Sequence, residues 1–110
     1  MSHEDVQSVV SEIVPCCHME WPNDSAPPLP WALFHGDDRP IPADDAQLAV
    51  MHRWTVELYE KRTDEDLELA LANALRERFG NVRRSESYIE NDNMLEVIFT
   101  FYQIEGEFDG

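Results

Sequence analysis

The sequence contains few glycines, few basic residues and only two cysteines. Four glycines in 110 residues leave no glycine-rich loop of the kind that holds phosphate groups, and no serine stands in the GxSxG motif of hydrolases. The cysteines, Cys16 and Cys17, are adjacent, and the peptide between them is too short for relaxed disulfide geometry. We therefore expect two reduced thiols, at least one of them packed in the interior.

Long hydrophobic segments are also missing. No apolar run approaches the roughly 18 residues that a membrane-spanning helix needs, and the acidic N-terminus lacks the basic start of a signal peptide. We expect a protein of the cytosol, or of an assembly that forms there, neither secreted nor embedded in a membrane.

Basic residues are scarce and unevenly placed. The chain has 23 acidic and 8 basic residues, a net charge of −15, which disfavours nucleic acid and anionic lipid as partners. A basic protein partner is compatible with this charge. Arg39 is the only base in residues 1–52. Later basic residues gather around a predicted second helix: Lys61, Arg62, Arg76, Arg78, Arg83 and Arg84.

The length suits a single domain, 1–110. Apolar residues recur at helical spacing from Val6 to Val14, after a capping Ser2, and Pro15 disfavours continuation; this predicts a helix over 2–14. Residues 15–30 are proline-rich and indicate an extended or irregular connection. An α+β body over 31–105 and a short acidic tail over 106–110 complete the chain.

Strand patterns follow the connection. Residues 31–35 indicate a short strand, 36–40 a turn, and 41–45 a loop, because Pro40 and Pro42 cannot donate to a central ladder. Residues 50–59 alternate, which predicts one buried face containing Trp54, Val56 and Leu58 and an opposite face containing Glu57 and Tyr59.

The clearest predicted element is a second helix. Thr63 and Asp64 form a capping sequence, Gly80 ends the helix, and leucines recur every four residues from Leu67 to Phe79, with Ala70 and Ala74 filling the stripe. A hairpin follows, with strands over 85–90 and 94–104; both faces of the second strand are apolar, so it belongs in mid-sheet.

These elements predict an α+β fold: an antiparallel sheet of about four strands with two main helices on one face. Their order is helix, strand, strand, helix, strand, strand.

No constellation indicates catalysis, a cofactor or a metal. Cys16, Cys17 and His18 form the most tempting cluster, but adjacent side chains diverge and seldom enclose one ion. Aspartate pairs 37–38 and 44–45 suit turns and helix caps, and no EF-hand pattern is present. We assign no catalytic, cofactor-binding or metal-ligating residue and expect no small-molecule substrate.

The charge distribution favours an interaction surface instead. Acidic and basic regions on one chain suit head-to-tail self-association, and Trp31, beside the proline-rich segment, is a candidate interface anchor. The candidate interface residues are Trp31, Arg62, Arg76, Arg78, Arg83 and Arg84, with Asp37, Asp38, Asp44 and Asp45 on the acidic side.

Residues 31–104 resemble, in pattern and order, the tail-completion or tail-terminator proteins of long-tailed phages and prophages. The resemblance rests on an aromatic segment (PWALFHGDD), a strand and acidic helix start (VELYEKRTDEDLE), and a final hairpin (YIENDNMLEVIFTFYQIEG). Residues 15–30 depart from that pattern. The resemblance implies a non-catalytic subunit that forms a ring, commonly a hexamer, at the end of the tail tube and joins it to the head connector. It implies assembly in the host cytoplasm and a final place in the virion tail.

Two other readings remain open from the sequence. The strong acidity is compatible with a binding module or inhibitor that mimics nucleic acid and occupies a basic protein. Cys16, Cys17 and His18 are the residues around which an enzyme or metal protein would be built.

Overall fold

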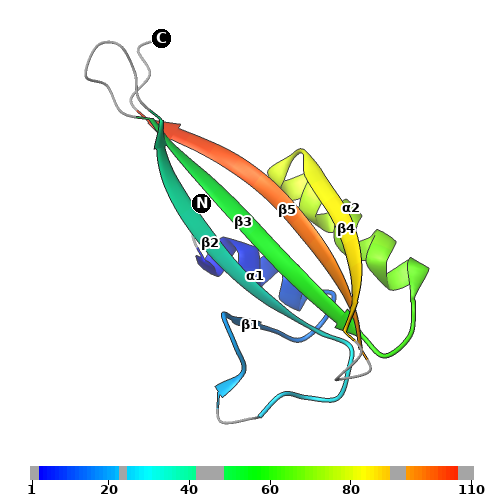
Figure 1. The fold of residues 1–110 in the computed structure, drawn as a ribbon. Helices are drawn as coiled ribbons and strands as arrows, with labels where there is room; N and C mark the ends of the chain where they lie inside the picture. Colours follow the sequence, from blue (N-terminus) through cyan, green and yellow to red (C-terminus); the bar gives the residue numbers. More distant parts are fainter. Residues whose placement is uncertain (1–2, 23–24, 42–48, 90–93, 107–110) are drawn as a thin grey trace.

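Strands β3 and β5 form the centre of a five-stranded sheet in the computed structural model (Figure 1). The structure describes residues 3–22, 25–41, 49–89 and 94–106. Its elements are α1 (His3–Ser11), β1 (Cys16–His18), β2 (Trp31–Ile41), β3 (Ala49–Glu60), α2 (Glu65–Phe79), β4 (Val82–Ile89) and β5 (Met94–Gly106).

The sheet has the strand order β1-β2-β3-β5-β4. Every neighbouring pair is antiparallel except β1 and β2, which run parallel. Helices α1 and α2 both pack on the same face of the sheet, and both lie behind the sheet in Figure 1. The predicted α+β class, the antiparallel sheet and the two helices on one face are therefore confirmed, and β1 is an additional strand.

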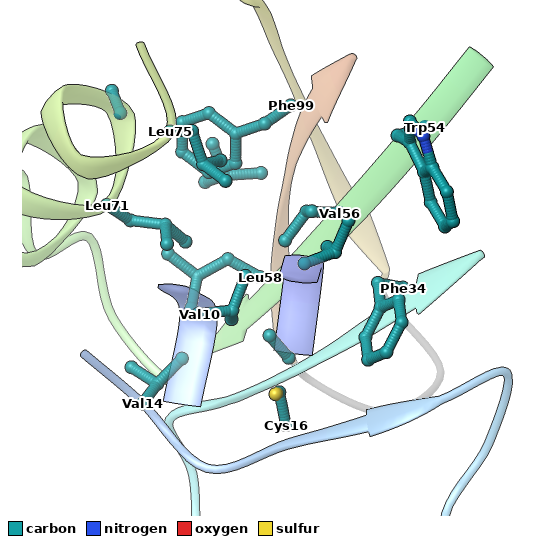
Figure 2. Packing of buried hydrophobic residues seen from close by; sticks show 14 of the residues in the cluster. Val10, Val14, Cys16, Phe34, Trp54, Val56, Leu58, Leu71, Leu75 and Phe99 are labelled. Carbon is teal, nitrogen blue, oxygen red and sulfur yellow. The ribbon is translucent and has the colours of Figure 1, made fainter. Parts of the chain in front are cut away.

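The core lies between this face and the helices, because alternate side chains of each strand point toward them. Figure 2 shows Val56 and Leu58 of β3, Phe99 of β5, and Leu71 and Leu75 of α2 in this core, with Leu75 beside Phe99. Trp54, Val56 and Leu58 of β3 are buried on the helix side, as the alternation predicted, but Tyr59 on the opposite face is buried as well. Val6 and Val10 of α1 are fully buried in the same core.

Helix α2 begins and ends where its capping residues predict. The Asp64 carboxylate accepts a hydrogen bond from the Leu67 backbone N–H (3.0 Å), and Gly80, at φ 92°, donates its N–H to the Arg76 carbonyl (2.9 Å). In the predicted leucine stripe, Leu71 and Leu75 are buried and Leu67 and Phe79 are partly buried, and the residues that complete the stripe differ from the prediction. Glu68 and Ala72 are buried, whereas Ala70 is exposed and Ala74 is half-buried.

The N-terminal region differs from the prediction in two ways. Helix α1 ends at Ser11 rather than at residue 14, and Val14 continues only as a turn, with its N–H bonded to the Val10 carbonyl at 3.0 Å. The connection over 15–30 is not wholly irregular, because Cys16–His18 pairs with Ala32–Phe34 as the edge strand β1. Three residues are too few to give a period that sequence reasoning detects.

The predicted turn over 36–40 is wrong, because β2 continues through it to Ile41. Gly36 lies opposite Trp54, and a Cβ at Gly36 would stand 2.9 Å from the indole ring. The glycine therefore permits a close approach of the ring rather than a change of chain direction. The predicted loop over 41–45 lies outside the described residues except for Ile41, which belongs to β2.

The C-terminal hairpin is confirmed and is longer than predicted. Strand β5 lies between β3 and β4, as the apolar character of both its faces predicted. Glu105 and Gly106 extend this strand, and the rest of the predicted tail lies outside the described residues. In the described part of the chain, neither helix has the length and apolar character needed to cross a membrane.

Candidate functional site

One face of the sheet, here called the open face, carries no helix in the described part of the chain. Its side chains alternate with the core residues along each strand. They come from β2 (Trp31, Leu33, His35 and Asp37), β3 (Arg53, Thr55, Glu57 and Tyr59), β5 (Glu96, Ile98, Thr100 and Tyr102) and β4 (Arg83 and Ser85). Polar and aromatic residues mix here, so the open face is the broadest candidate interaction surface.

A cluster of hydrogen-bonded side chains on the open face surrounds Tyr59. Its hydroxyl lies 2.5 Å from Glu57 Oε2 and 2.6 Å from Glu96 Oε2. The carboxylates of Glu57 and Glu96 therefore lie close together. The hydroxyl has a single hydrogen and donates it to one carboxylate at a time. Burial raises the pKa of Tyr59 well above its usual range, and hydrogen bonds to Glu57 and Glu96 add to this, so the hydroxyl remains a neutral donor.

The aromatic ring of Trp31 packs against Tyr59, next to these carboxylates. Its ring centroid lies 4.7 Å from that of Tyr59 and 5.9 Å from that of Trp21. His35 Nδ1 is 3.5 Å from Glu57 Oε1. Aromatic rings next to carboxylates suit a cationic side chain of a partner, so the structure places the predicted anchor Trp31 next to groups of fitting chemistry.

The predicted acidic residues lie partly in ion pairs. Asp37 pairs with Arg53 on the open face, and Asp38 pairs with His52 on the helix side of the sheet. Asp44 and Asp45 lie outside the described residues. Arg53 of the neighbouring strand thus compensates the charge of Asp37.

The predicted basic residues separate onto different surfaces. Arg84 points to the helix side and pairs with Glu68 and Glu86, whereas Arg83 lies on the open face. Arg78 lies 3.9 Å from Asp5 and so connects α2 to α1. Three of the predicted interface arginines are exposed and make no ion pair within the described residues: Arg62, Arg76 and Arg83.

A buried pair of carboxyl groups lies beneath the start of α2. Glu60 and Glu68 are 2% and 1% exposed, and the Asp64 N–H points at both, 3.1 Å from Glu60 Oε2 and 3.2 Å from Glu68 Oε2. Burial raises the pKa of Glu60 to about 7, with a hydrogen bond to Glu68 and its charge as further causes. Glu60 Oε1 has no hydrogen-bond partner within the described residues.

Sequence reasoning missed both the cluster around Tyr59 and the pair of carboxyl groups formed by Glu60 and Glu68. Glu60 ends an alternating strand and Glu68 lies three residues before Leu71, so each occupies a position where the period predicts burial. A glutamate at a buried helical position is the signal that was available. Chemically, a carboxyl with a pKa near 7 can exchange a proton at neutral pH, but this one is enclosed by α2, β3 and Arg84.

Cys16, Cys17 and His18 diverge along β1. Cys16 is buried, Cys17 Sγ donates to the Glu20 carbonyl (3.2 Å), and the exposed His18 ring lies 4.1 Å from that of His3. Burial, followed by the neighbouring Cys17, raises the pKa of Cys16 to about 11. Across the described ranges, no three histidine, cysteine or acidic side chains gather as metal ligands would.

Comparison with known proteins gives a likeness in fold. No family model matches the chain, and no curated protein matches it. Among solved structures, the chain is similar to one in a structure described as the virion of a native gene transfer agent (GTA) particle. The TM-score is 0.56 at 12% sequence identity, over 93% of this chain and 84% of that chain. The sheet-and-helix fold described above therefore also occurs in a chain of a gene transfer agent virion.

Proposed function

We propose that this protein is a non-catalytic structural subunit of a phage-like virion, which completes or terminates the tail tube and joins it to the head connector. The observation that carries the proposal is the fold likeness to a chain of a gene transfer agent virion over nearly the whole length of both chains. The order of sequence features in residues 31–104 supports the finer assignment to the tail, since it resembles tail-completion proteins.

The buried carboxyl pair fits a structural role. Glu60 and Glu68 both accept from the Asp64 N–H, the capping residue of α2, and Arg84 compensates the charge of Glu68. Such a pair holds the start of a helix against the sheet. Because Glu60 is only 2% exposed, a substrate would reach it only if α2 moved away.

Assembly follows from the surface chemistry. Head-to-tail ring closure needs two different, complementary surfaces on each subunit. The carboxylates around Tyr59 lie on the open face, whereas Arg62 precedes α2 and Arg76 lies on α2, so groups of opposite charge are exposed on separate surfaces. The proposed partners are further copies of this chain, in a ring such as a hexamer, and other tail or connector proteins. The subunit would assemble in the host cytoplasm and remain in the virion tail.

The test is deletion of the gene in a strain that produces the particles. We expect unjoined heads and tails, with tubes of irregular or excessive length, by electron microscopy. Supplying the chain in trans should restore joined particles, and antibody against it should label the head–tail junction. Joined particles of normal length in the deletion strain would overturn the proposal.

A matched variant tests the non-catalytic part. Glu60→Gln removes the proton-exchanging group and keeps the shape of the side chain, so it should restore joined particles as well as the natural chain does. Failure of Glu60→Gln despite normal folding and abundance would argue for acid–base chemistry at this residue. Capture of a nucleic-acid-binding protein, without any label on particles, would favour an acidic inhibitor.

A further inference from the structure

Strand β2 has an edge that β1 covers only in part. Strand β1 pairs with Ala32–Phe34, where the Ala32 N–H donates to the Pro15 carbonyl and the Phe34 carbonyl accepts from the Met19 N–H, both at 2.9 Å. Backbone groups alternate in direction along a strand, so those of Gly36 and Asp38 point to the same side. No described strand lies beside residues 35–41 on that side (Figure 1).

Strand β4 is the opposite edge of the same sheet. It pairs with β5 along all of its 8 residues, Val82–Ile89, and no described strand lies on its other side. Backbone N–H and C=O groups on a long open edge pair readily with another strand. The uncovered part of β2 and the whole of β4 are similar in length.

The directions of the two edges fit each other. The pairs β2–β3, β3–β5 and β5–β4 are all antiparallel, so β4 runs antiparallel to β2. If a second copy extends the sheet of the first copy beyond β2, the β4 of the second copy runs antiparallel to the β2 of the first. Because two different edges meet, the contact repeats from copy to copy and gives a ring or a filament.

Charge complementarity identifies the occupant. Asp37 and Asp38 lie on the uncovered part of β2, and Arg83 and Arg84 lie at the start of β4. Asp37 and Arg83 belong to the same open face, and opposite charges on neighbouring strands stabilise pairing. Arg53 bonds Asp37 Oδ2, which leaves Oδ1 for a second donor, while Arg83 makes no ion pair within the described residues.

We propose that residues 35–40 of β2 bind Val82–Ser87 of the β4 edge of a second copy of this chain, so that the sheet continues from subunit to subunit. The strands run antiparallel with Ser85 opposite Asp37 and Arg83 diagonal to it on the same face, and β1 keeps its place beside Ala32–Phe34. The inference rests on the proposed function, since it names the surfaces that close the ring. The same acidic charges repel an acidic strand.

Disulfide trapping tests the pairing in the purified full chain. In a background with Cys16→Ala and Cys17→Ser, the double variant Asp37→Cys/Arg83→Cys is oxidised over a range of concentrations and separated under non-reducing conditions. Asp37→Cys/Ser85→Cys samples the residue directly opposite Asp37 in the proposed register, and Arg83 is its diagonal neighbour on the same face. We expect a ladder of dimers and larger species from one of these variants. Asp37→Cys/Glu86→Cys is the matched control, because Glu86 points to the opposite face, and it should form few links.

A second pair of variants isolates the backbone contribution. Asp38→Asn and Asp38→Pro both remove the carboxylate, but only proline removes the outward N–H. In the cross-linking background we expect Asp38→Pro to slow linking about fivefold relative to Asp38→Asn, the factor of one net hydrogen bond. Circular dichroism verifies that both variants keep the fold.

The outcomes separate the pairing from the proposed function. Absence of links from both the Arg83→Cys and the Ser85→Cys double variants at the highest concentration, or equal linking by Asp37→Cys alone, would overturn the β2–β4 pairing. Unjoined particles in the deletion strain would in that case still support the tail role. Links in the expected register together with normal particles in the deletion strain would overturn the tail role and leave the pairing in place.

Discussion

Arg84 on β4 pairs with Glu68 on α2, and the glutamate is the buried partner: its side chain is 1% exposed and that of Arg84 is 36% exposed. Glu60 lies beside Glu68, and both accept from the Asp64 N–H. One guanidinium thus compensates the charge of the carboxyl pair on which the first turn of α2 rests. The edge strand and the helix are joined electrostatically as well as by apolar packing.

Removing this guanidinium should destabilise the protein markedly. Arg84→Met leaves the carboxylate of Glu68 buried without its ion-pair partner, so we expect a loss of about 3 kcal/mol in the free energy of unfolding. Urea denaturation at pH 8 measures it. Arg83→Met is the matched control, since Arg83 is exposed and without an ion pair in the described part of the chain, and it should change stability by less than about 0.5 kcal/mol. Equal losses in the two variants would contradict the assignment.

The close approach of Trp54 to Gly36 makes a second prediction. A Cβ at Gly36 would lie 2.9 to 3.1 Å from three atoms of the indole ring, so Gly36→Ala should cost about 1 to 3 kcal/mol through overpacking. Chemical denaturation of a double-mutant cycle tests the cause. In a Trp54→Phe background the smaller ring should reduce the cost of Gly36→Ala, and an unchanged cost would rule out this contact.

The periodic elements were predictable because their local signals agree with their packing. Asp64 and Gly80 end α2 in the structure as their capping preferences predict. The alternation of β3 assigned its buried face because one face meets the helices and the other does not. Packing and propensity indicate the same structure at these positions.

Other features depend on contacts between distant parts of the chain. Gly36 reads as a turn residue until Trp54 is seen opposite it, and β1 exists because Ala32–Phe34 offers an edge. Glu68 occupies a helical position where the period predicts burial, but only the fold shows that Glu60 and Arg84 lie beside it. Register and side-chain pairing across the sheet determine these features, and sequence reasoning did not resolve either.

The two cysteines should differ sharply in reactivity. Cys16 is buried with a pKa raised to about 11 by burial, and thiol alkylation requires the thiolate. Cys17 is only half-buried. Treatment of the folded protein with iodoacetamide at pH 8, read by mass spectrometry of peptides, should label Cys17 first and Cys16 only after urea is added. Equal labelling rates in the folded protein would contradict the packing of Cys16.

The Glu60 carboxyl should make the stability depend on pH. Its pKa is about 7 in the folded protein and near 4.5 when exposed, so the folded state binds the proton more tightly. Its contribution to stability is therefore complete below about pH 4.5 and is lost as the pH rises through 7. Glu60→Gln stays neutral and still accepts from the Asp64 N–H, so it should lack this loss and exceed the natural chain in free energy of unfolding by about 2 kcal/mol at pH 8.

Urea denaturation of both proteins from pH 5 to pH 8 measures that difference. The comparison cancels the contributions of groups that titrate in both proteins, such as His18. Desolvation and the neighbouring His3 and His35 lower the pKa of His18. Its contribution to stability is therefore lost as the pH falls, in the opposite direction to that of Glu60. Glu65→Gln is the matched control, because Glu65 is exposed in the first turn of α2 and should leave the slope unchanged. If Glu60→Gln keeps the slope of the natural chain, the proton is not held at Glu60, and the stabilisation of α2 must come from Arg84 and Asp64 alone.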